Sequence, residues 1–250
     1  MFLNCDRNKR SVVLDLRNKS DQQVLHRIVA QCDVCWHSIR LRAAERMGIS
    51  YETLSRINPK LVYCHVKGCS DNGLYAGKPA YDDIIQALTG VAPLQTSVVG
   101  KPRYMPTIFA DKMSSIHAAY AVMLALLHRE RTGRGQEVVM PMFEAITGFN
   151  CVEHLWGSTF ESPIAGMGYA TIVKAARKPY ETKDGCIAFL PYTDSHLQRF
   201  FDAIGLPAIM KDERFCAGEG CLKRAHSRAA LGRPLVRAIC ARPDAFHKLS

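Results

Sequence analysis

The feature that most constrains the fold is a regular alternation of short apolar segments with amphipathic ones. The apolar segments at 11–16, 33–36, 61–66 and 136–142 have the length of strands, and helical patterns separate them. The segment at 61–66 is almost continuously apolar, which is typical of a strand buried on both faces. Strands that alternate with helices predict an α/β fold with a Rossmann-like parallel sheet.

Helical periodicity predicts helices at 21–30, 42–47, 51–57, 81–88, 111–131 and 143–156. We expect Ser20 to cap the first of them. The centre of the segment 111–131 is apolar on nearly every side, so this helix should be deeply buried. The glycines at 133 and 135 provide a stop with a left-handed residue.

The composition changes near Gly157, where a loop rich in glycine begins. We therefore predict a large domain over 1–157, a linker over 158–178 and a smaller α+β domain over 179–250. The smaller domain should contain a strand at 186–190 and helices at 194–204 and 222–240.

The charge balance is basic, with 33 Lys and Arg against 23 Asp and Glu, a formal net charge of +10. Such a balance suits a polyanionic partner, either a nucleic acid, an acidic membrane or a phosphate-rich cofactor. No pattern of interleaved basic and aromatic residues favours a nucleic acid. No apolar run reaches the roughly 18 residues of a membrane span, so we expect neither nucleic acid nor membrane as partner.

The ten cysteines show no regular framework, and a chain this long does not need disulfides. We expect reduced, mostly buried thiols in a cytoplasmic protein. Cys32 and Cys35 form a single CxxC with no second pair, and the nine histidines lack metal-ligand spacing, so no metal is expected.

One carboxylate stands out once common motifs are excluded. The chain contains no GxxxxGK[ST], no GxGxxG after a strand, no HExxH and no GxSxG. Glu144 follows the apolar strand 136–142 and opens a helix, at the edge of an α/β sheet where sites form. On position alone, an acid that stabilises the helix dipole is the simpler interpretation.

The order of several motifs resembles the class III CoA-transferases, the formyl-CoA/carnitine-CoA transferase family. No single motif is diagnostic, but the series covers most of the chain in the family's order. The matching stretches are 8–16 (NKRSVVLDL), 44–49 (AERMGI), 57–63 (INPKLVY), 81–90 (YDDIIQALTG), 110–111 (AD), 128–136 (HRERTGRGQ), 177–185 (RKPYETKDG) and 190–194 (LPYTD).

This resemblance implies a transferase that moves CoA from an acyl-CoA to a small carboxylic acid, with Glu144 as the nucleophile. In the family, a carboxylate at this place forms a mixed anhydride and then an enzyme–CoA thioester. The family pattern has Asp here; residues 141–144 (PMFE) resemble a branch that carries Glu. The resemblance also implies contacts to coenzyme A from Ser38, Ile39, Arg40, Arg46, Met47, Lys78, Tyr81 and Asp111. Asp111 is equally well explained as a cap of its own helix.

The family also implies an interlocked homodimer. Against its pattern, the chain starts after the first βα segment and stops inside the small domain, so we expect a fragment or a truncated product. Two alternatives stay open. One is a relative of the 2-methylacyl-CoA racemases, which need a histidine near the start of the long helix, where only His117 is close. The other is an inactive CoA-binding or subunit-interaction module.

Overall fold

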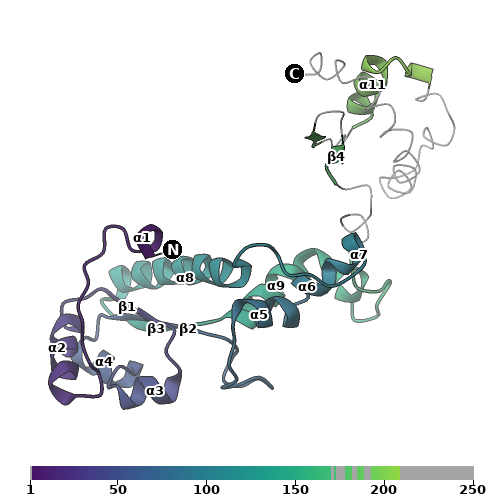
Figure 1. Cartoon of the computed structure of the whole chain (residues 1–250). Coiled ribbons are helices and arrows are strands. Elements are labelled where there is room, and N and C mark those ends of the chain that lie inside the picture. The colour runs from purple at the N-terminus through teal and green to yellow at the C-terminus, as the bar shows by residue number, and fades with distance from the viewer. Residues whose placement is uncertain (1, 170–171, 173–177, 182–184, 189–192, 209–250) are drawn as a thin grey trace. The chain divides into compact units, whose positions relative to one another are not determined.

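The computed structural model describes residues 2–169, 172, 178–181, 185–188 and 193–208 (Figure 1). Contacts divide the chain into two units, Met1–Ala92 with Arg103–Val152, and Pro93–Pro102 with Glu153–Ser250. The predicted limits of the two domains stay predictions, and the predicted helix at 222–240 lies outside the described residues.

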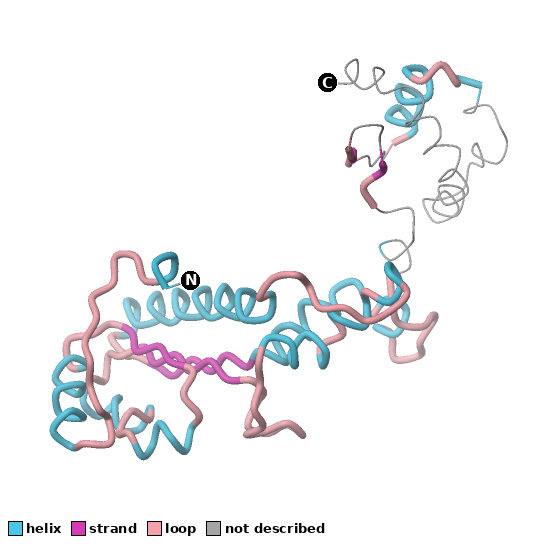
Figure 2. The backbone as a smooth tube through the Cα atoms, viewed as in Figure 1, coloured by secondary structure: helices cyan, strands magenta, loops and turns pink. Residues whose placement is uncertain are grey.

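The first unit alternates helices with strands (Figure 2). In chain order its elements are α1 (Phe2–Cys5), α2 (Lys19–Val29), β1 (Val34–His37), α3 (Leu41–Arg46), α4 (Tyr51–Ile57), β2 (Val62–Lys67), α5 (Asp82–Leu88), α6 (Val91–Leu94), α8 (Phe109–Thr132), β3 (Gln136–Pro141) and α9 (Met142–His154), with α6 and α9 each running a short way into the second unit.

The three strands form a parallel sheet in the order β1-β2-β3. Val34 lies opposite Val62, and Val62 opposite Gln136. Helix α8 covers one face of this sheet, and α2, α3 and α4 lie on the other (Figure 1). The predicted α/β class with a parallel sheet is thereby confirmed.

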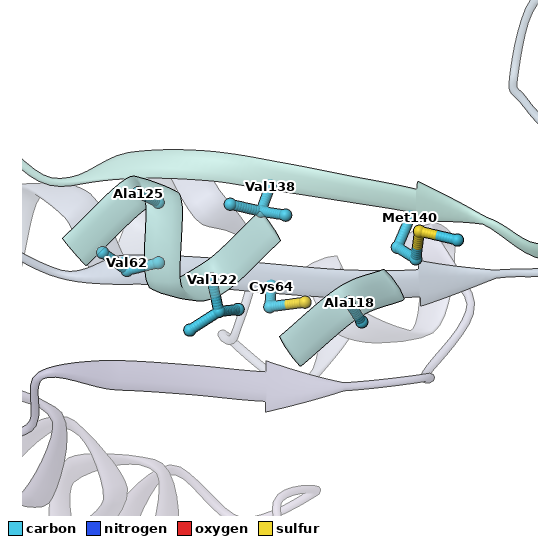
Figure 3. Close-up of a cluster of buried hydrophobic side chains, with 7 residues drawn as sticks. All are labelled: Val62, Cys64, Ala118, Val122, Ala125, Val138 and Met140. Atoms are coloured by element: carbon cyan, nitrogen blue, oxygen red, sulfur yellow. The ribbon is translucent and has the colours of Figure 1, made fainter. Parts of the chain in front are cut away.

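The two faces of β2 explain this layering. Val62 and Cys64 point toward α8, where they pack with Ala118, Val122 and Ala125 (Figure 3). Leu61, just before the strand, and Tyr63 pack instead against α2, α3 and α4. Because successive side chains of a strand point to opposite faces, a segment that is apolar throughout needs a cover on both sides, and β2 has one.

Helix α8 is less buried than the sequence suggests. Its sheet side uses small residues, but a stripe on the opposite side is exposed and apolar, namely Ile116, Tyr120, Met123 and Leu127. These positions are spaced four, three and four residues apart, which places them along one face of the helix. The expectation of deep burial on all sides is therefore wrong, because no element of the described chain packs on this stripe.

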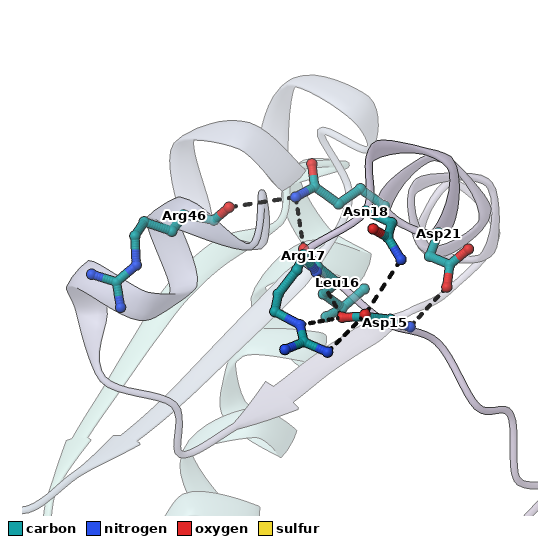
Figure 4. Close-up of polar contacts among 7 residues, drawn as sticks. Asp15, Leu16, Arg17, Asn18, Asp21 and Arg46 are labelled. Atoms are coloured by element: carbon teal, nitrogen blue, oxygen red, sulfur yellow. Dashed lines mark hydrogen bonds and ion pairs between the residues drawn. The ribbon is translucent and has the colours of Figure 1, made fainter.

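The segment 11–16 is not a strand, contrary to the prediction. Val12 and Val13 are 61% and 93% exposed, and the next residues form a turn instead (Figure 4). In that turn Asp15 accepts hydrogen bonds from the Arg17 side chain and donates its backbone N–H to Asp21. Helix α2 consequently begins at Lys19 with Asn18 at the N-cap, so Ser20 is not its cap.

The turn between α8 and β3 depends on two glycines. Gly133 has φ +72° and ends α8 in the left-handed conformation, as predicted. A Cβ on Gly135 would lie 2.0 Å from the Leu61 carbonyl oxygen, so only glycine lets β3 start beside β2.

The second unit holds α7 (Thr96–Val99), η1 (Trp156–Thr159), the antiparallel pair β4 (Tyr180–Glu181) and β5 (Cys186–Ile187), and α11 (Asp194–Ala203). Thr193 caps α11 by accepting from the His196 N–H. Phe200 and Phe201 are buried on this helix. β5 and α11 lie within the strand predicted at 186–190 and the helix predicted at 194–204.

The seven described cysteines are all free, but only Cys64 and Cys69 are buried. The expectation of mostly buried thiols is wrong for this set, since Cys5 and Cys186 lie on the surface and the other three are half-buried. No helix in the described segments has the length and hydropathy to cross a bilayer.

Candidate functional site

A cleft of about 1450 Å³ opens where the strands end. Its walls include the last residue of β1 (His37), the end of β2 (Lys67) and the first residue after β3 (Met142). This is the edge where parallel sheets place their ligands. The volume exceeds the roughly 300–1,000 Å³ of ordinary small-molecule sites, so the cleft has room for a large ligand.

One end of the cleft is strongly basic. Arg40, Arg42 and Arg46 line it, and the last two are four residues apart and share a face of α3. Helix α2 holds this region through Gln22, whose side chain donates to the carbonyls of Leu16 and Arg46 at 2.8 and 3.4 Å. Three guanidinium groups in one wall suit phosphates, which they bind through paired hydrogen bonds.

The middle of the cleft holds an ion pair. Lys67 Nζ lies 2.5 Å from Asp71 Oδ2, and the lysine side chain is only 11% exposed. Lys78 extends from the loop after β2 and lies 5.2 Å above the Tyr75 ring. Lys67 is thus paired with an acid that also lines the cleft, whereas Lys78 lies over an aromatic ring.

Two histidines form part of the floor. The rings of His37 and His65 are 4.7 Å apart, and both line the cleft. Burial, with the neighbouring His65, lowers the pKa of His37 to about 4. Burial also lowers the pKa of His65, with Lys67 contributing in the same direction. Both imidazoles are therefore neutral at physiological pH.

The start of α8 forms the far wall, through Asp111, Ser114 and Ser115. Asp82 of α5 accepts a hydrogen bond from the Asp111 backbone N–H at 3.1 Å and another from the Gln86 side chain at 2.6 Å. The first turn of α8 is thus capped from another helix rather than by Asp111. Burial and the nearby Asp82 raise the pKa of Asp111.

Glu144 lies in the first turn of α9 and is not one of the residues that line the cleft; Met142, two residues before it, does line the cleft. The Glu144 Oε1 accepts a hydrogen bond from the Ser70 backbone N–H at 2.9 Å, and the Phe143 N–H donates to the Gly68 carbonyl at 2.9 Å. The side chain is exposed. Gly68, Cys69 and Asp71 line the cleft, so the loop that holds the carboxylate is itself part of the wall. An oriented carboxylate that stays accessible is suited to attack an electrophile.

Six of the eight residues that the resemblance assigns to coenzyme A line this cleft, namely Ser38, Arg40, Arg46, Lys78, Tyr81 and Asp111. Ile39 and Met47 do not, because their side chains pack on the core formed by α2, α3 and α4. Ile39 nevertheless lies between two cleft residues, so its backbone belongs to the same turn.

Sequence reasoning missed several residues of the cleft, above all His37, His65, Lys67 and Ser114. The first three lie at or near the carboxyl ends of β1 and β2. The rule that sites form at the carboxyl ends of parallel strands could therefore have indicated them. Ser114 lies inside a helix and had no such signal. Among the described residues, no three metal-binding side chains cluster closely enough to hold a metal ion.

Comparison with known proteins places this geometry in a family. The model of CoA-transferase family III matches residues 1–246. An acetyl-CoA:oxalate CoA-transferase of Acetobacter aceti is 29% identical over 253 aligned positions, covering 97% of this chain and 63% of that protein. The beta subunit of a succinyl-CoA–L-malate CoA-transferase of Chloroflexus aurantiacus is 31% identical, covering 90% of this chain and 56% of that protein.

The fold leads to the same group. A crystal structure of a CaiB/BaiF family protein from Brucella suis has a TM-score of 0.78 and 29% identity, covering 98% of this chain and 65% of that one. The chain thus spans less than two thirds of the length of each of these three relatives. Since the family model extends over nearly every residue, the chain belongs to CoA-transferase family III.

Proposed function

We propose that the chain transfers CoA from an acyl-CoA to a small carboxylic acid, with Glu144 as the covalent nucleophile. The observation that carries this proposal is a basic cleft together with an exposed carboxylate that is hydrogen-bonded to the loop forming part of the cleft wall. Family membership supports it, because the relatives described above are named as CoA-transferases acting on oxalate and L-malate.

The charges of the cleft suggest how an acyl-CoA lies in it. The phosphates of CoA would lie against Arg40, Arg42 and Arg46. The pantetheine arm would then follow the floor past Lys67 toward Met142, so that the thioester reaches Glu144. Lys78 and Tyr81 would flank this approach, and Asp111 would face the arm from α8.

The proposed cycle has four steps and no net proton transfer. The Glu144 carboxylate attacks the thioester carbonyl carbon, the C–S bond breaks, and CoA leaves as a thiolate. The thiolate attacks the Glu144 carbonyl carbon of the anhydride, which releases the donor acid and leaves a glutamyl-CoA thioester. The acceptor carboxylate attacks this thioester and expels the thiolate. The thiolate then attacks the acceptor's carbonyl and frees Glu144.

Glutamate instead of the family's aspartate moves the carboxyl group by one C–C bond, about 1.5 Å. Misplacement by about 1 Å can cost roughly a hundredfold in rate, so the backbone has to compensate. The contacts of the α9 start with Gly68 and Ser70 support a carboxylate held for attack from this longer side chain.

The first test is transfer itself. Acetyl-CoA, formyl-CoA and succinyl-CoA serve as donors, with oxalate, L-malate and glutarate as acceptors, and new CoA esters are measured by liquid chromatography. Glu144→Gln should abolish exchange while CoA binding, measured by calorimetry, survives. Glu130→Gln is the matched control, because Glu130 is exposed and pairs with Arg129 outside the cleft. Undiminished exchange by Glu144→Gln would refute the assignment.

The second test looks for the covalent intermediate. After mixing with acyl-CoA alone, the peptide that contains Glu144 should gain the mass of CoA, and hydroxylamine should remove it. An adduct on a different peptide would assign the nucleophile elsewhere.

The alternatives predict other results. A racemase would exchange the α-proton of a 2-methylacyl-CoA with deuterium without an acceptor acid. No observation favours it, because His117 is hydrogen-bonded to the Met113 carbonyl at 2.8 Å and does not line the cleft. An inactive module would bind CoA and exchange nothing.

We also propose that the chain forms a homodimer, as the resemblance to the family implies. The exposed stripe of α8, made of Ile116, Tyr120, Met123 and Leu127, supports this proposal, since exposed apolar patches mark association surfaces.

A further inference from the structure

A pair of side chains connects two segments of the basic end of the cleft. His37 ends β1 opposite His65 of β2, and Tyr63, which is 1% exposed, lies two residues before His65 on that strand. The Nε2 atom of His37 is 2.5 Å from the Tyr63 hydroxyl oxygen. That hydroxyl donates to the carbonyl of Ile49, just beyond α3, at 3.0 Å.

The hydrogen bonds of this pair have only one consistent direction. The Ile39 backbone N–H donates to His37 Nδ1 at 3.1 Å, so Nδ1 carries no proton and Nε2 carries it. The Nε2–H therefore donates to the Tyr63 oxygen, and the Tyr63 O–H donates to Ile49. Each donor has one acceptor, and the chain runs unbroken from residue 39 to residue 49.

The connected segments carry the arginines. Ile39 lies between Ser38 and Arg40, and Ile49 follows Arg46 by three residues; Ser38, Arg40 and Arg46 all line the cleft. The ring of His65 lies beside this pair, 4.7 Å from that of His37.

Helix α2 holds the other segment. Its Gln22 and His26 bond to the carbonyls of Arg46 and Gly48. Neither segment can shift without breaking bonds made by the other.

We propose that His37 and Tyr63 are positioning residues that set the spacing between Arg40 and Arg46 for the phosphate-bearing end of CoA. This inference rests on the proposed function, because it assigns the basic end of the cleft to the nucleotide. Neither side chain is assigned a part in the transfer chemistry, which the proposed function gives to Glu144 at the start of α9.

The proposal predicts a specific loss for Tyr63→Phe. Removing the hydroxyl breaks the link but keeps the ring in its aromatic cluster. Binding of adenosine 3′,5′-bisphosphate, which is CoA without its phosphopantetheine arm, should weaken by about three- to tenfold, the range of one net hydrogen bond. CoA binding should weaken by the same factor. In the transfer assay KM for the acyl-CoA should rise and kcat should stay unchanged.

Two further variants keep the test sharp. His37→Asn retains an acceptor for the Ile39 N–H but cannot reach Tyr63, so it should weaken binding as Tyr63→Phe does. The double variant should be no weaker than either single one, because both remove the same link. Tyr51→Phe is the control; its ring packs 5.6 Å from that of Tyr63, and α4 does not line the cleft.

Calorimetry with adenosine 3′,5′-bisphosphate and CoA, together with steady-state kinetics, decides the matter. If the wild-type chain binds both ligands and Tyr63→Phe and His37→Asn bind them as Tyr51→Phe does, the positioning role is overturned while the proposed function stands. If the wild-type chain binds neither ligand, the proposed function and this inference fall together. Loss of stability without a change in affinity would leave Tyr63 as a packing residue and overturn the proposal.

Discussion

At the scale of single residues, His37 makes the fold sensitive to acid. Its pKa is lowered to about 4 by burial and by His65, against about 6.5 in an unfolded chain. The unfolded chain therefore binds the extra proton first, and the free energy of unfolding should fall as pH drops from 6.5 toward 4. Urea unfolding at pH 7.5, 5.5 and 4.5 should show a shallower fall for His37→Asn than for the wild type. Parallel curves would contradict an imidazole that is kept neutral by partial burial.

Ser114 offers a second prediction at this scale. Its Oγ is buried and, among the described residues, has no hydrogen-bond partner. Ser114→Ala should therefore leave the free energy of unfolding unchanged or raise it by up to about 1 kcal/mol. Ser50, also buried, accepts from the Thr53 N–H as the cap of α4, so Ser50→Ala should cost about 1 kcal/mol. Equal losses in the two variants, measured by urea unfolding, would refute the difference in partners.

Residue placement was only partly predictable. The position of Glu144 at the start of a helix after a strand could be predicted, because the sequence pattern changes there from that of a strand to that of a helix. The orientations of Ile39 and Met47 were not, since each lies in a short connection where one peptide rotation moves a side chain from cleft to core. His37 was missed for a related reason, because its role depends on Tyr63, 26 residues away.

At the scale of elements, the turn into β3 gives the clearest prediction. Gly135→Ala would bring a methyl group against the Leu61 carbonyl, and the backbone there cannot yield without disturbing β2. We expect a loss of at least about 1–3 kcal/mol in the free energy of unfolding, the usual cost of overpacking.

The matched control is Gly148→Ala in α9, where a Cβ would meet nothing within 4 Å. Alanine should stabilise that helix by up to about 1 kcal/mol. Similar stabilities of the two variants in urea would contradict the close approach of β3 to β2.

The helices and strands could be predicted from the periodicity of apolar residues wherever one face, or both faces, of the element are buried. The three strands of the sheet and the long helix lie within a few residues of their predicted bounds. The strand predicted at 11–16 was wrong because its apolar residues have no neighbouring strand in the described chain, and β-propensity alone does not form a strand. The predicted burial of α8 on all sides was wrong because the sequence of an apolar helix face does not show whether that face is buried or exposed.

At the scale of the whole molecule, the stripe of α8 predicts how copies associate. Tyr120→Glu would place a charge in the centre of the stripe and should shift a dimer toward monomer in size-exclusion chromatography with light scattering. Val13→Glu is the control, because Val13 is 93% exposed and lies outside the stripe. A wild-type chain that stays monomeric at all concentrations would contradict the proposed homodimer.

The same stripe determines how the protein behaves on dilution. If the proposed homodimer dissociates, four large apolar side chains of α8 would face water, and a dye that fluoresces on hydrophobic surfaces should adsorb there. Its emission per chain should decrease as the solution is concentrated and the copies cover one another. Dilute samples of the chain will accordingly require buffers that suppress aggregation, because the apolar face of α8 is exposed.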